Sequence, residues 1–239
     1  MKCAVLLSGP TSGLGNELLQ QLGGLDHQLI LVGRKLERLA EPIQQASAPI
    51  RTIEFDLALT VLPGIADELE QAVFDALQES RPDLLIFVNN AGVIEPIGRI
   101  GSFRPSQLVE SMAVNLIAPM AIASACQKYA RGCLSRIIVL NVSSGAAMRA
   151  IPGWSAYCST KAAARMYFDV LASEEEARVA VHQFDPGVLD TQMQEKIRAS
   201  SAGQFPMVEQ FVRLKKDSLL KAPADVARQV VAQIKGWIE

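Results

Sequence analysis

The sequence predicts an α/β protein built on a single doubly wound parallel sheet. Short apolar runs alternate with longer amphipathic stretches along most of the 239 residues. Most of these runs are continuous rather than alternating, as in strands that are buried on both faces of a parallel sheet. The first run leads directly into a glycine-rich turn, which is where such a sheet binds a ligand.

Six apolar runs are predicted as strands, near residues 4–7, 29–32, 50–55, 84–88, 137–142 and 179–184. Amphipathic stretches between them predict helices near 13–23, 35–46, 65–80, 106–131 and 155–176, with a last helix near 223–237. Strand and helix alternate, so right-handed crossovers would connect the strands. No composition shift marks a linker, and we expect one domain over residues 1–239.

The composition excludes several classes of protein. Hydrophobic residues make up 49% of the chain and charged residues 20%, which argues against disorder. The net charge is −2 without a basic stripe, so we expect no nucleic-acid partner. We found no apolar stretch of the length that a membrane span needs. The cysteines lack metal-ligand spacing and no secretory signal is evident, so we expect reduced thiols and a cytoplasmic protein.

The polar stretch at about 188–216 breaks the alternation of strand and helix. It follows the last predicted strand, at the edge of the sheet where ligands bind. We interpret it as a mobile lid or substrate loop, because long loops are often functional. An ordinary surface insertion is the alternative.

The first predicted strand is followed by the pattern G-x-x-x-G-x-G. Glycines let the backbone turn tightly and approach a pyrophosphate, and the following helix offers free N–H groups. A buried strand before the turn and an amphipathic helix after it strengthen this prediction over a plain tight turn. The predicted phosphate-binding residues are Gly9, Thr11, Ser12, Gly13, Leu14 and Gly15.

Gly33-Arg34-Lys35 stands at the end of the second predicted strand, where a carboxylate would favour NAD. An arginine can pair with a 2′-phosphate instead, so we expect NADPH. A solvated helix start is the alternative for the two basic residues. Asp56, followed by Leu57, is predicted to contact the adenine, although Asp56 can equally cap a turn.

Tyr157 and Lys161 are four residues apart, which places them on one face of a helix. A phenol has a pKa of about 10 and is a poor acid or base at neutral pH. An ammonium about 4 Å away would lower that pKa by up to about three units. The pair therefore predicts proton transfer by Tyr157.

Three further positions complete the predicted chemistry. Ser144 ends the fifth strand, where a hydroxyl can hold a carbonyl oxygen against the tyrosine. Asn115 lies inside an apolar helical run, where it needs a partner, and it can hold a water that links to Lys161. Asn90-Ala91-Gly92 follows the fourth strand, where small residues would let a cofactor lie against the backbone.

These motifs occur in the order found in short-chain dehydrogenase/reductases, and the chain resembles that family. The resemblance covers residues 1–190 and extends loosely beyond them. It implies a Rossmann-type fold in which Tyr157 is the acid, Lys161 its activator, Ser144 the substrate-orienting group and Asn115 part of a proton relay. It also implies that Pro186-Gly187-Val188, with Thr191, holds the carboxamide of the nicotinamide. The family's usual final strand has no counterpart in this sequence.

The segments 153–163 and 185–194 are similar to sepiapterin reductases and benzil-type diketone reductases. This narrower resemblance implies an NADPH-dependent reductase of a small ketone or dicarbonyl. The broader family resemblance implies a homodimer formed through the two long helices. Trp154 and Met193 are candidate substrate contacts, with core or lid packing as the alternative. Two other functions stay open: an NAD-dependent alcohol dehydrogenase, and a regulator that binds NADPH without catalysis.

Overall fold

The computed structural model describes residues 1–174 and 178–238. Six parallel strands form one sheet in the order β3-β2-β1-β4-β5-β6. The strands are β1 (Cys3–Ser8), β2 (Gln28–Gly33), β3 (Ile50–Glu54), β4 (Leu84–Asn89), β5 (Arg136–Val142) and β6 (Val179–Phe184). All six coincide with predicted strands, and the predicted single doubly wound parallel sheet is confirmed.

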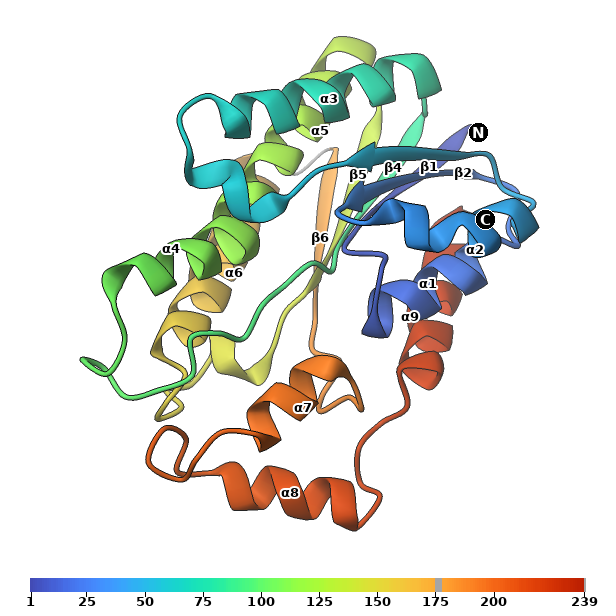
Figure 1. Cartoon of the computed structure of the whole chain (residues 1–239). Coiled ribbons are helices and arrows are strands. Elements are labelled where there is room, and N and C mark those ends of the chain that lie inside the picture. Colours follow the sequence, from blue (N-terminus) through green and yellow to red (C-terminus); the bar gives the residue numbers. More distant parts are fainter. Residues whose placement is uncertain (175–177, 239) are drawn as a thin grey trace.

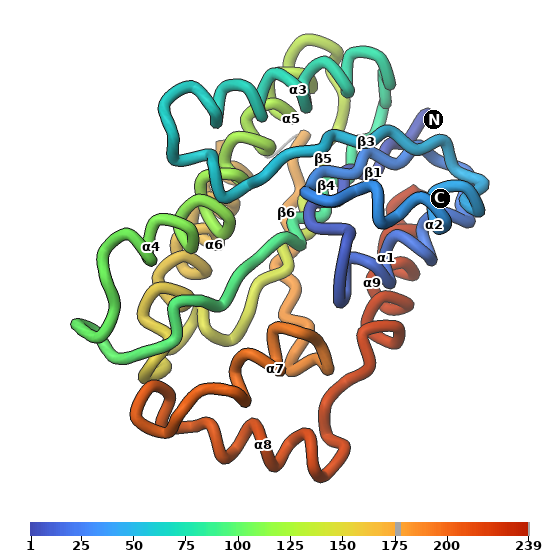
Figure 2. Tube along the Cα trace, viewed as in Figure 1, coloured from blue at the N-terminus to red at the C-terminus, as the bar shows by residue number. Residues whose placement is uncertain are grey.

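Helices cover both faces of the sheet (Figure 1). On one face lie α1 (Gly13–Leu22), α2 (Ala40–Gln45) and α9 (Pro223–Ile238); α1 and α9 are far apart in sequence but pack side by side (Figure 2). On the other face lie α3 (Ile65–Ser80), α5 (Ala118–Cys133) and α6 (Ser155–Glu174). Alternate residues of β1 serve the two resulting cores: Leu6 packs in the core with α3 and α5, and Leu7 in the core with α1 and α9.

Two predicted helices are interrupted. The stretch near 35–46 begins as the 3₁₀ helix η1 (Leu36–Leu39) before α2, and another 3₁₀ helix, η2 (Leu57–Val61), precedes α3. The stretch near 106–131 consists of α4 (Pro105–Met112), a π-helical turn η3 (Ala113–Ile117) and α5. A short 3₁₀ helix η4 (Gly145–Ala147) connects β5 to α6.

The helical stretch Pro105–Cys133 is long and apolar enough to cross a membrane. This finding differs from our expectation that no apolar stretch is long enough for a membrane span. However, 56% of its most apolar window is buried inside the fold, where α5 packs beside α3 and against strands β4 and β5. This burial is that of a core helix in a globular protein.

The segment predicted as a loop at about 188–216 is largely helical. It contains α7 (Gln192–Arg198) and α8 (Val208–Lys216), which lie beyond the carboxyl end of the sheet (Figure 1). Several of its apolar side chains are buried, and Phe205 is fully buried against Trp154, with 4.8 Å between ring centroids. The prediction of a loop was wrong because the two helices are short and a turn-rich stretch at 200–206, which contains Ser, Gly and Pro, separates them.

Candidate active site

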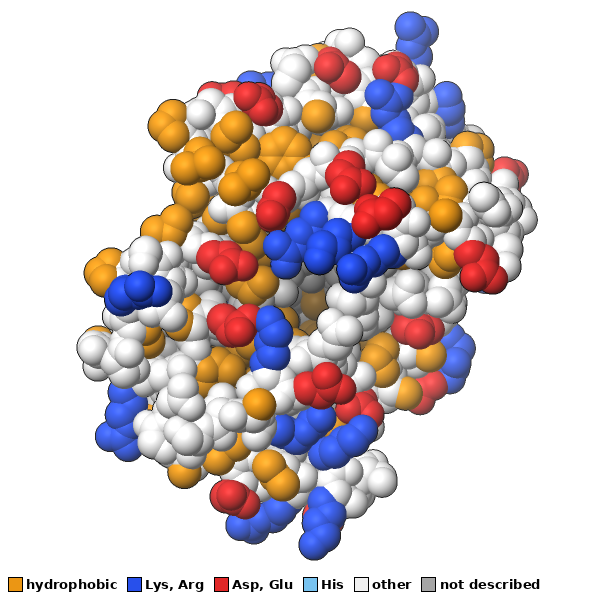
Figure 3. All heavy atoms as spheres, in the orientation of Figure 1, with side chains coloured by type: hydrophobic (Ala, Val, Ile, Leu, Met, Phe, Trp, Pro, Cys, Tyr) orange, Lys and Arg blue, Asp and Glu red, His pale blue; other side chains and the backbone are white. Residues whose placement is uncertain are grey.

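The carboxyl ends of the strands open into a cavity of about 680 Å³. Figure 3 shows this hollow in the middle of one face, with charged side chains of both signs around it. The cavity lies where the strand order reverses between β1 and β4, which is the position at which doubly wound sheets bind ligands. It extends from the glycine turn after β1 to the start of α6.

The glycine turn is shaped for a close ligand. Gly9 and Gly13 have φ values of +67° and +52°, a region that favours glycine. A Cβ atom on Gly15 would lie 2.0 Å from the Gly9 carbonyl oxygen, so a side chain there would push the turn away from α1. Backbone and small side chains at the N-terminus of α1 therefore line the cavity, which suits a dinucleotide pyrophosphate.

Asn90 holds the glycine turn in place from the neighbouring strand. Its Nδ2 donates to the carbonyl oxygens of Ser8 and Gly9 at 3.1 and 3.0 Å. The hydroxyl oxygen of Ser8 accepts from the backbone N–H groups of Asn90 and Ala91 at 3.0 and 3.1 Å. The ends of β1 and β4 are thereby joined into one rigid wall of the cavity.

Of the two basic residues that follow β2, only one lines the cavity. Arg34 lines the cavity, and its Nη1 lies 3.5 Å from Oδ2 of Asp56, so both are at the same end of the cavity. Asp56 also accepts from the backbone N–H of Ala58, which makes it the cap of η2 as well. The Lys35 side chain is exposed and does not line the cavity, while its backbone N–H donates to Glu54.

Ser144, Tyr157 and Lys161 meet at the opposite end of the cavity, as their spacing predicts. Tyr157 and Lys161 are one turn apart on α6 and both are buried, while Ser144 comes from the end of β5 and is hydrogen-bonded to Tyr157. The Lys161 ammonium lies 5.8 Å from the Tyr157 ring centroid and donates to the carbonyl oxygen of Val142 at 2.8 Å.

Burial raises the pKa of Tyr157 to about 12, with a smaller opposing effect from the Ser144 hydrogen bond and a further increase from the charge of Asp185. Burial also lowers the pKa of Lys161 to about 8. The predicted net direction of the shift was wrong, because the pKa of Tyr157 is raised rather than lowered. Desolvation of the phenol outweighs the attraction of an ammonium that is directed at Val142, so Tyr157 is protonated at neutral pH.

Asn115 lies in the π-helical turn η3, behind the cavity rather than in its lining. Its Oδ1 accepts from the backbone N–H of Val93 at 2.8 Å, and its Nδ2 donates to the Val93 carbonyl oxygen at 2.9 Å. Nδ2 is also within hydrogen-bond distance of Thr160, one residue before Lys161. The side chain thus fixes the segment after β4 against α6.

The segment after β6 closes the cavity from the other side. Gly187 is in the left-handed region at φ +74°, and Pro186, Gly187, Val188 and Thr191 all line the cavity. Thr191 lies over the glycine turn, because a Cβ atom on Gly13 would be 3.2 Å from its Cγ2. The structure therefore brings the two motifs predicted for the cofactor into contact across the cavity.

Comparison with protein families shows to which family this chain belongs. The family model for short-chain dehydrogenases matches residues 3–202, which is most of the chain. The chain belongs to the short-chain dehydrogenase/reductase family. It is therefore an oxidoreductase that acts on carbonyl or alcohol groups.

Several members of the family are similar to this chain over most of its length. Benzil reductase ((S)-benzoin forming) of Bacillus cereus is 30% identical and aligns with 95% of this chain and 91% of the relative. Sepiapterin reductase of Xenopus laevis is 33% identical over 80% of this chain and 74% of the relative. Both narrower resemblances are thus confirmed as relationships.

Solved structures of other enzymes have the same fold as this chain. The KRED1-Pglu enzyme is 27% identical, with a TM-score of 0.80 over 95% of this chain and 92% of that one. The angucycline C-6 ketoreductase LanV with bound NADP is 26% identical, with a TM-score of 0.72 over 96% and 87% of the two chains.

The wall of the cavity beyond Tyr157 is aromatic and apolar in this short-chain dehydrogenase/reductase. Trp154 and Met193, the two predicted substrate contacts, both line it. Trp154 packs edge-to-face on Tyr157 at 5.8 Å and on Phe211 at 5.5 Å. Phe211 and Met207 were not predicted, and the two phenylalanines at 205 and 211 in an otherwise polar stretch were the available signal.

Most of the predicted residues line one continuous cavity. Gly15, Lys35 and Asn115 do not: Gly15 packs beneath the turn, Lys35 points to solvent and Asn115 braces the wall. The predicted cofactor and substrate residues that do line it are Gly9, Thr11, Ser12, Gly13, Leu14, Arg34, Asp56, Leu57, Asn90, Ala91, Gly92, Ser144, Trp154, Tyr157, Lys161, Pro186, Gly187, Val188, Thr191 and Met193.

Proposed function

We propose that this protein is an NADPH-dependent reductase of small ketones or dicarbonyls, with Tyr157 as the acid. The observation that carries the proposal is the convergence of Ser144, Tyr157 and Lys161 on the cavity that also contains the glycine turn. The cofactor, when bound, supplies a hydride. The relatives named for benzil and sepiapterin reduction support a dicarbonyl substrate for this chain as well.

The residues at the chemical end suit reduction. Ser144 and Tyr157 form a pair of hydroxyl groups that can hold a substrate carbonyl oxygen. Tyr157 is protonated at neutral pH and can donate its proton to that oxygen as negative charge develops there. The Lys161 ammonium, buried one helical turn away, stabilises the phenolate that remains. The raised pKa of Tyr157 disfavours the oxidative direction, which needs the phenolate at the start.

Arg34 supports a preference for NADPH. It lies at the end of the cavity that is remote from Tyr157 and shares that end with Asp56. A guanidinium can bind the 2′-phosphate through charge-assisted hydrogen bonds. The related ketoreductase structure with bound NADP is consistent with this choice.

The cofactor proposal is tested by fluorescence titration of wild type, Arg34→Ala and Lys35→Ala with NADPH and NADH. Loss of a charge-assisted hydrogen bond should weaken NADPH binding by about 10- to 100-fold in Arg34→Ala and leave NADH binding nearly unchanged. Lys35→Ala is the matched control, because Lys35 lies outside the cavity lining. Tighter binding of NADH than NADPH by the wild type would overturn the NADPH assignment.

The catalytic proposal is tested by steady-state loss of NADPH absorbance with benzil, sepiapterin and simple ketones. We expect turnover of the dicarbonyls. Tight NADPH binding without turnover of any carbonyl would instead support a regulator that binds the nucleotide. We further propose that the protein is cytoplasmic, because no secretory signal is evident, and that it is a homodimer, as the family resemblance implies.

A further inference from the structure

A second cavity of about 360 Å³ adjoins the proposed substrate site. It lies between the segment after β4 and the C-terminal part of α7. One residue, Lys196 of α7, lines both cavities. The second cavity has apolar and polar lining: Pro96, Ile97, Phe103 and Ala199, with Ser102, Gln107, Ser200 and Gln204.

An ion pair stands at the boundary between the two cavities. The Lys196 ammonium pairs with the carboxylate of Glu95, which lines the second cavity. Ile94, which precedes Glu95, and Ile197, which follows Lys196, are both buried and line the first cavity. The pair therefore connects the segment after β4 to α7 at the point where the substrate cavity ends.

The pair is suited to control access rather than to hold the fold together. The side chains of Lys196 and Glu95 are 53% and 54% exposed, and ion pairs so exposed add little to stability. Apolar contacts hold α7 and α8 instead, through Ile197 of α7, Phe211 of α8 and Phe205 in the connection between them. Removing the pair should open the boundary and leave the helices packed.

We propose that the Glu95–Lys196 pair sets the length of substrate that this enzyme accepts, by separating the substrate cavity from the second cavity. This inference rests on the proposed reductase function. With the pair closed, a substituent on the carbonyl ends at Lys196. With the pair removed, an alkyl substituent can continue into the second cavity and contact Ile97 and Phe103.

The test compares phenylpropanedione with phenylheptanedione, two dicarbonyls that differ by four methylene groups. We expect the kcat/KM ratio of the long to the short substrate to rise about tenfold or more in Lys196→Ala and in Glu95→Ala, because the extra methylenes become buried. In Glu95→Ala the value for phenylpropanedione should change less than about twofold, because Glu95 does not line the substrate cavity. Asp169→Ala is the matched control, because it removes an exposed ion pair on α6 that lies outside both cavities.

Charge reversal separates the ion pair from a local packing effect. The double variant Glu95→Lys with Lys196→Glu restores the pair, so it should restore the wild-type ratio, whereas each single reversal should raise it. An unchanged ratio in the alanine variants, or no recovery in the double variant, would overturn the proposal.

Calorimetric titration with the same two diones, without reduced cofactor, provides a readout that does not depend on turnover. A shift of affinity toward the long dione in Lys196→Ala supports the partition even if no carbonyl is reduced, which would refute the reductase function alone. If the wild type reduces the diones but neither the kcat/KM ratio nor the affinity ratio of the long to the short dione shifts in Lys196→Ala, the role of the ion pair alone is refuted.

Discussion

Burial changes the proton affinity of both central side chains of the site. It raises the pKa of Tyr157 to about 12 and lowers that of Lys161 to about 8. The tyrosine therefore stays protonated across the physiological range, while the lysine loses its charge just above it. In the proposed mechanism, Lys161 rather than Tyr157 is therefore the group whose titration would limit reduction at alkaline pH.

The pH dependence of reduction follows from these two values. If the ammonium form of Lys161 stabilises the phenolate as proposed, kcat/KM should be at its plateau near pH 6, fall to half at about pH 8 and continue to fall above it. Tyr157, with a pKa of about 12, should not titrate in this range. Initial rates from pH 6 to 10 check this, and a profile that stays flat to pH 10 would contradict it.

The spacing in the sequence predicted where these side chains lie, but it did not predict the direction in which their pKa values shift. The i, i+4 spacing correctly placed Tyr157 and Lys161 together on α6. The direction of the pKa shift depends on burial and on where the ammonium points, and neither follows from spacing. Asp185 acts on Tyr157 through space from the end of β6, so its contribution also required the fold.

At the scale of elements, the strands were predictable because each is a continuous apolar run. The helices α7 and α8 were not predictable in the same way, because each is short and the stretch between them is rich in Ser, Gly and Pro. The glycine turn was predictable in kind, but only the structure shows how closely α1 approaches it. That approach depends on Gly15, which packs under the Gly9 carbonyl.

Gly15→Ala tests this close approach. The added Cβ would lie 2.0 Å from the Gly9 oxygen and 2.6 Å from Nδ2 of Asn90. Overpacking against backbone should destabilise the protein by about 3 kcal/mol and weaken NADPH binding, because the turn must move. Urea unfolding and cofactor titration measure the two effects.

Gly132→Ala is the control for the same substitution in a helix. A Cβ atom there meets nothing within 4 Å. The free energy of unfolding should therefore rise by about 0.5–1 kcal/mol, because alanine loses less backbone entropy than glycine when the chain folds. Equal stability changes in the two variants would show that contact with the glycine turn is not what constrains Gly15.

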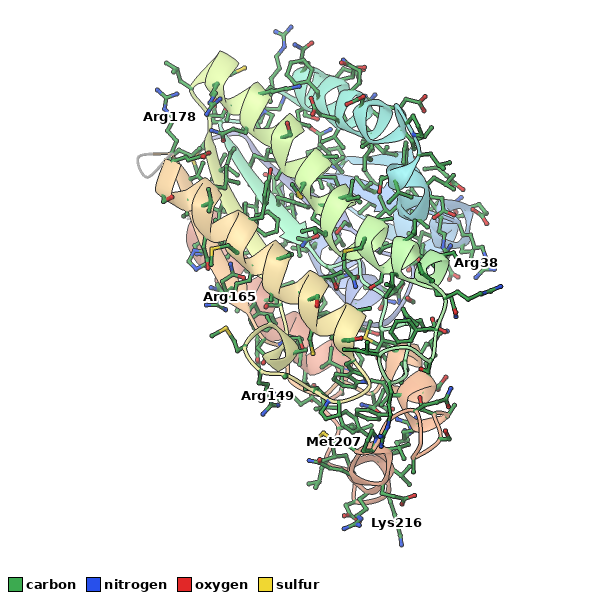
Figure 4. All side chains as sticks on the ribbon, turned by 90° about the vertical axis from the view of Figure 1, so that its left-hand side faces the viewer. Arg38, Arg149, Arg165, Arg178, Met207 and Lys216 are labelled. Carbon is green, nitrogen blue, oxygen red and sulfur yellow. The ribbon has the colours of Figure 1, made fainter. Side chains whose placement is uncertain are left out.

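At the scale of the whole molecule, α5 and α6 lie side by side on one face (Figure 4). On that face α6 exposes Met166 and Val170, with 63% and 44% of their surface accessible. Such apolar residues suit a protein contact. We propose that this face forms the homodimer that the family resemblance implies.

Met166→Lys should therefore convert the protein to a monomer in sedimentation velocity experiments at micromolar concentration. Leu219→Lys, an equally exposed apolar position between α8 and α9, should leave the dimer intact. A monomeric wild type, or dissociation by Leu219→Lys alone, would contradict this interface.

The most direct test of the account is single-turnover reduction of benzil by wild type and Tyr157→Phe, each saturated with NADPH. The phenylalanine keeps the ring against Trp154 but removes the proton donor. We predict that hydride transfer slows by about 10²- to 10⁴-fold while the Kd for NADPH changes less than about twofold. A variant that reduces benzil at a rate near that of wild type would contradict the assignment of Tyr157 as the acid.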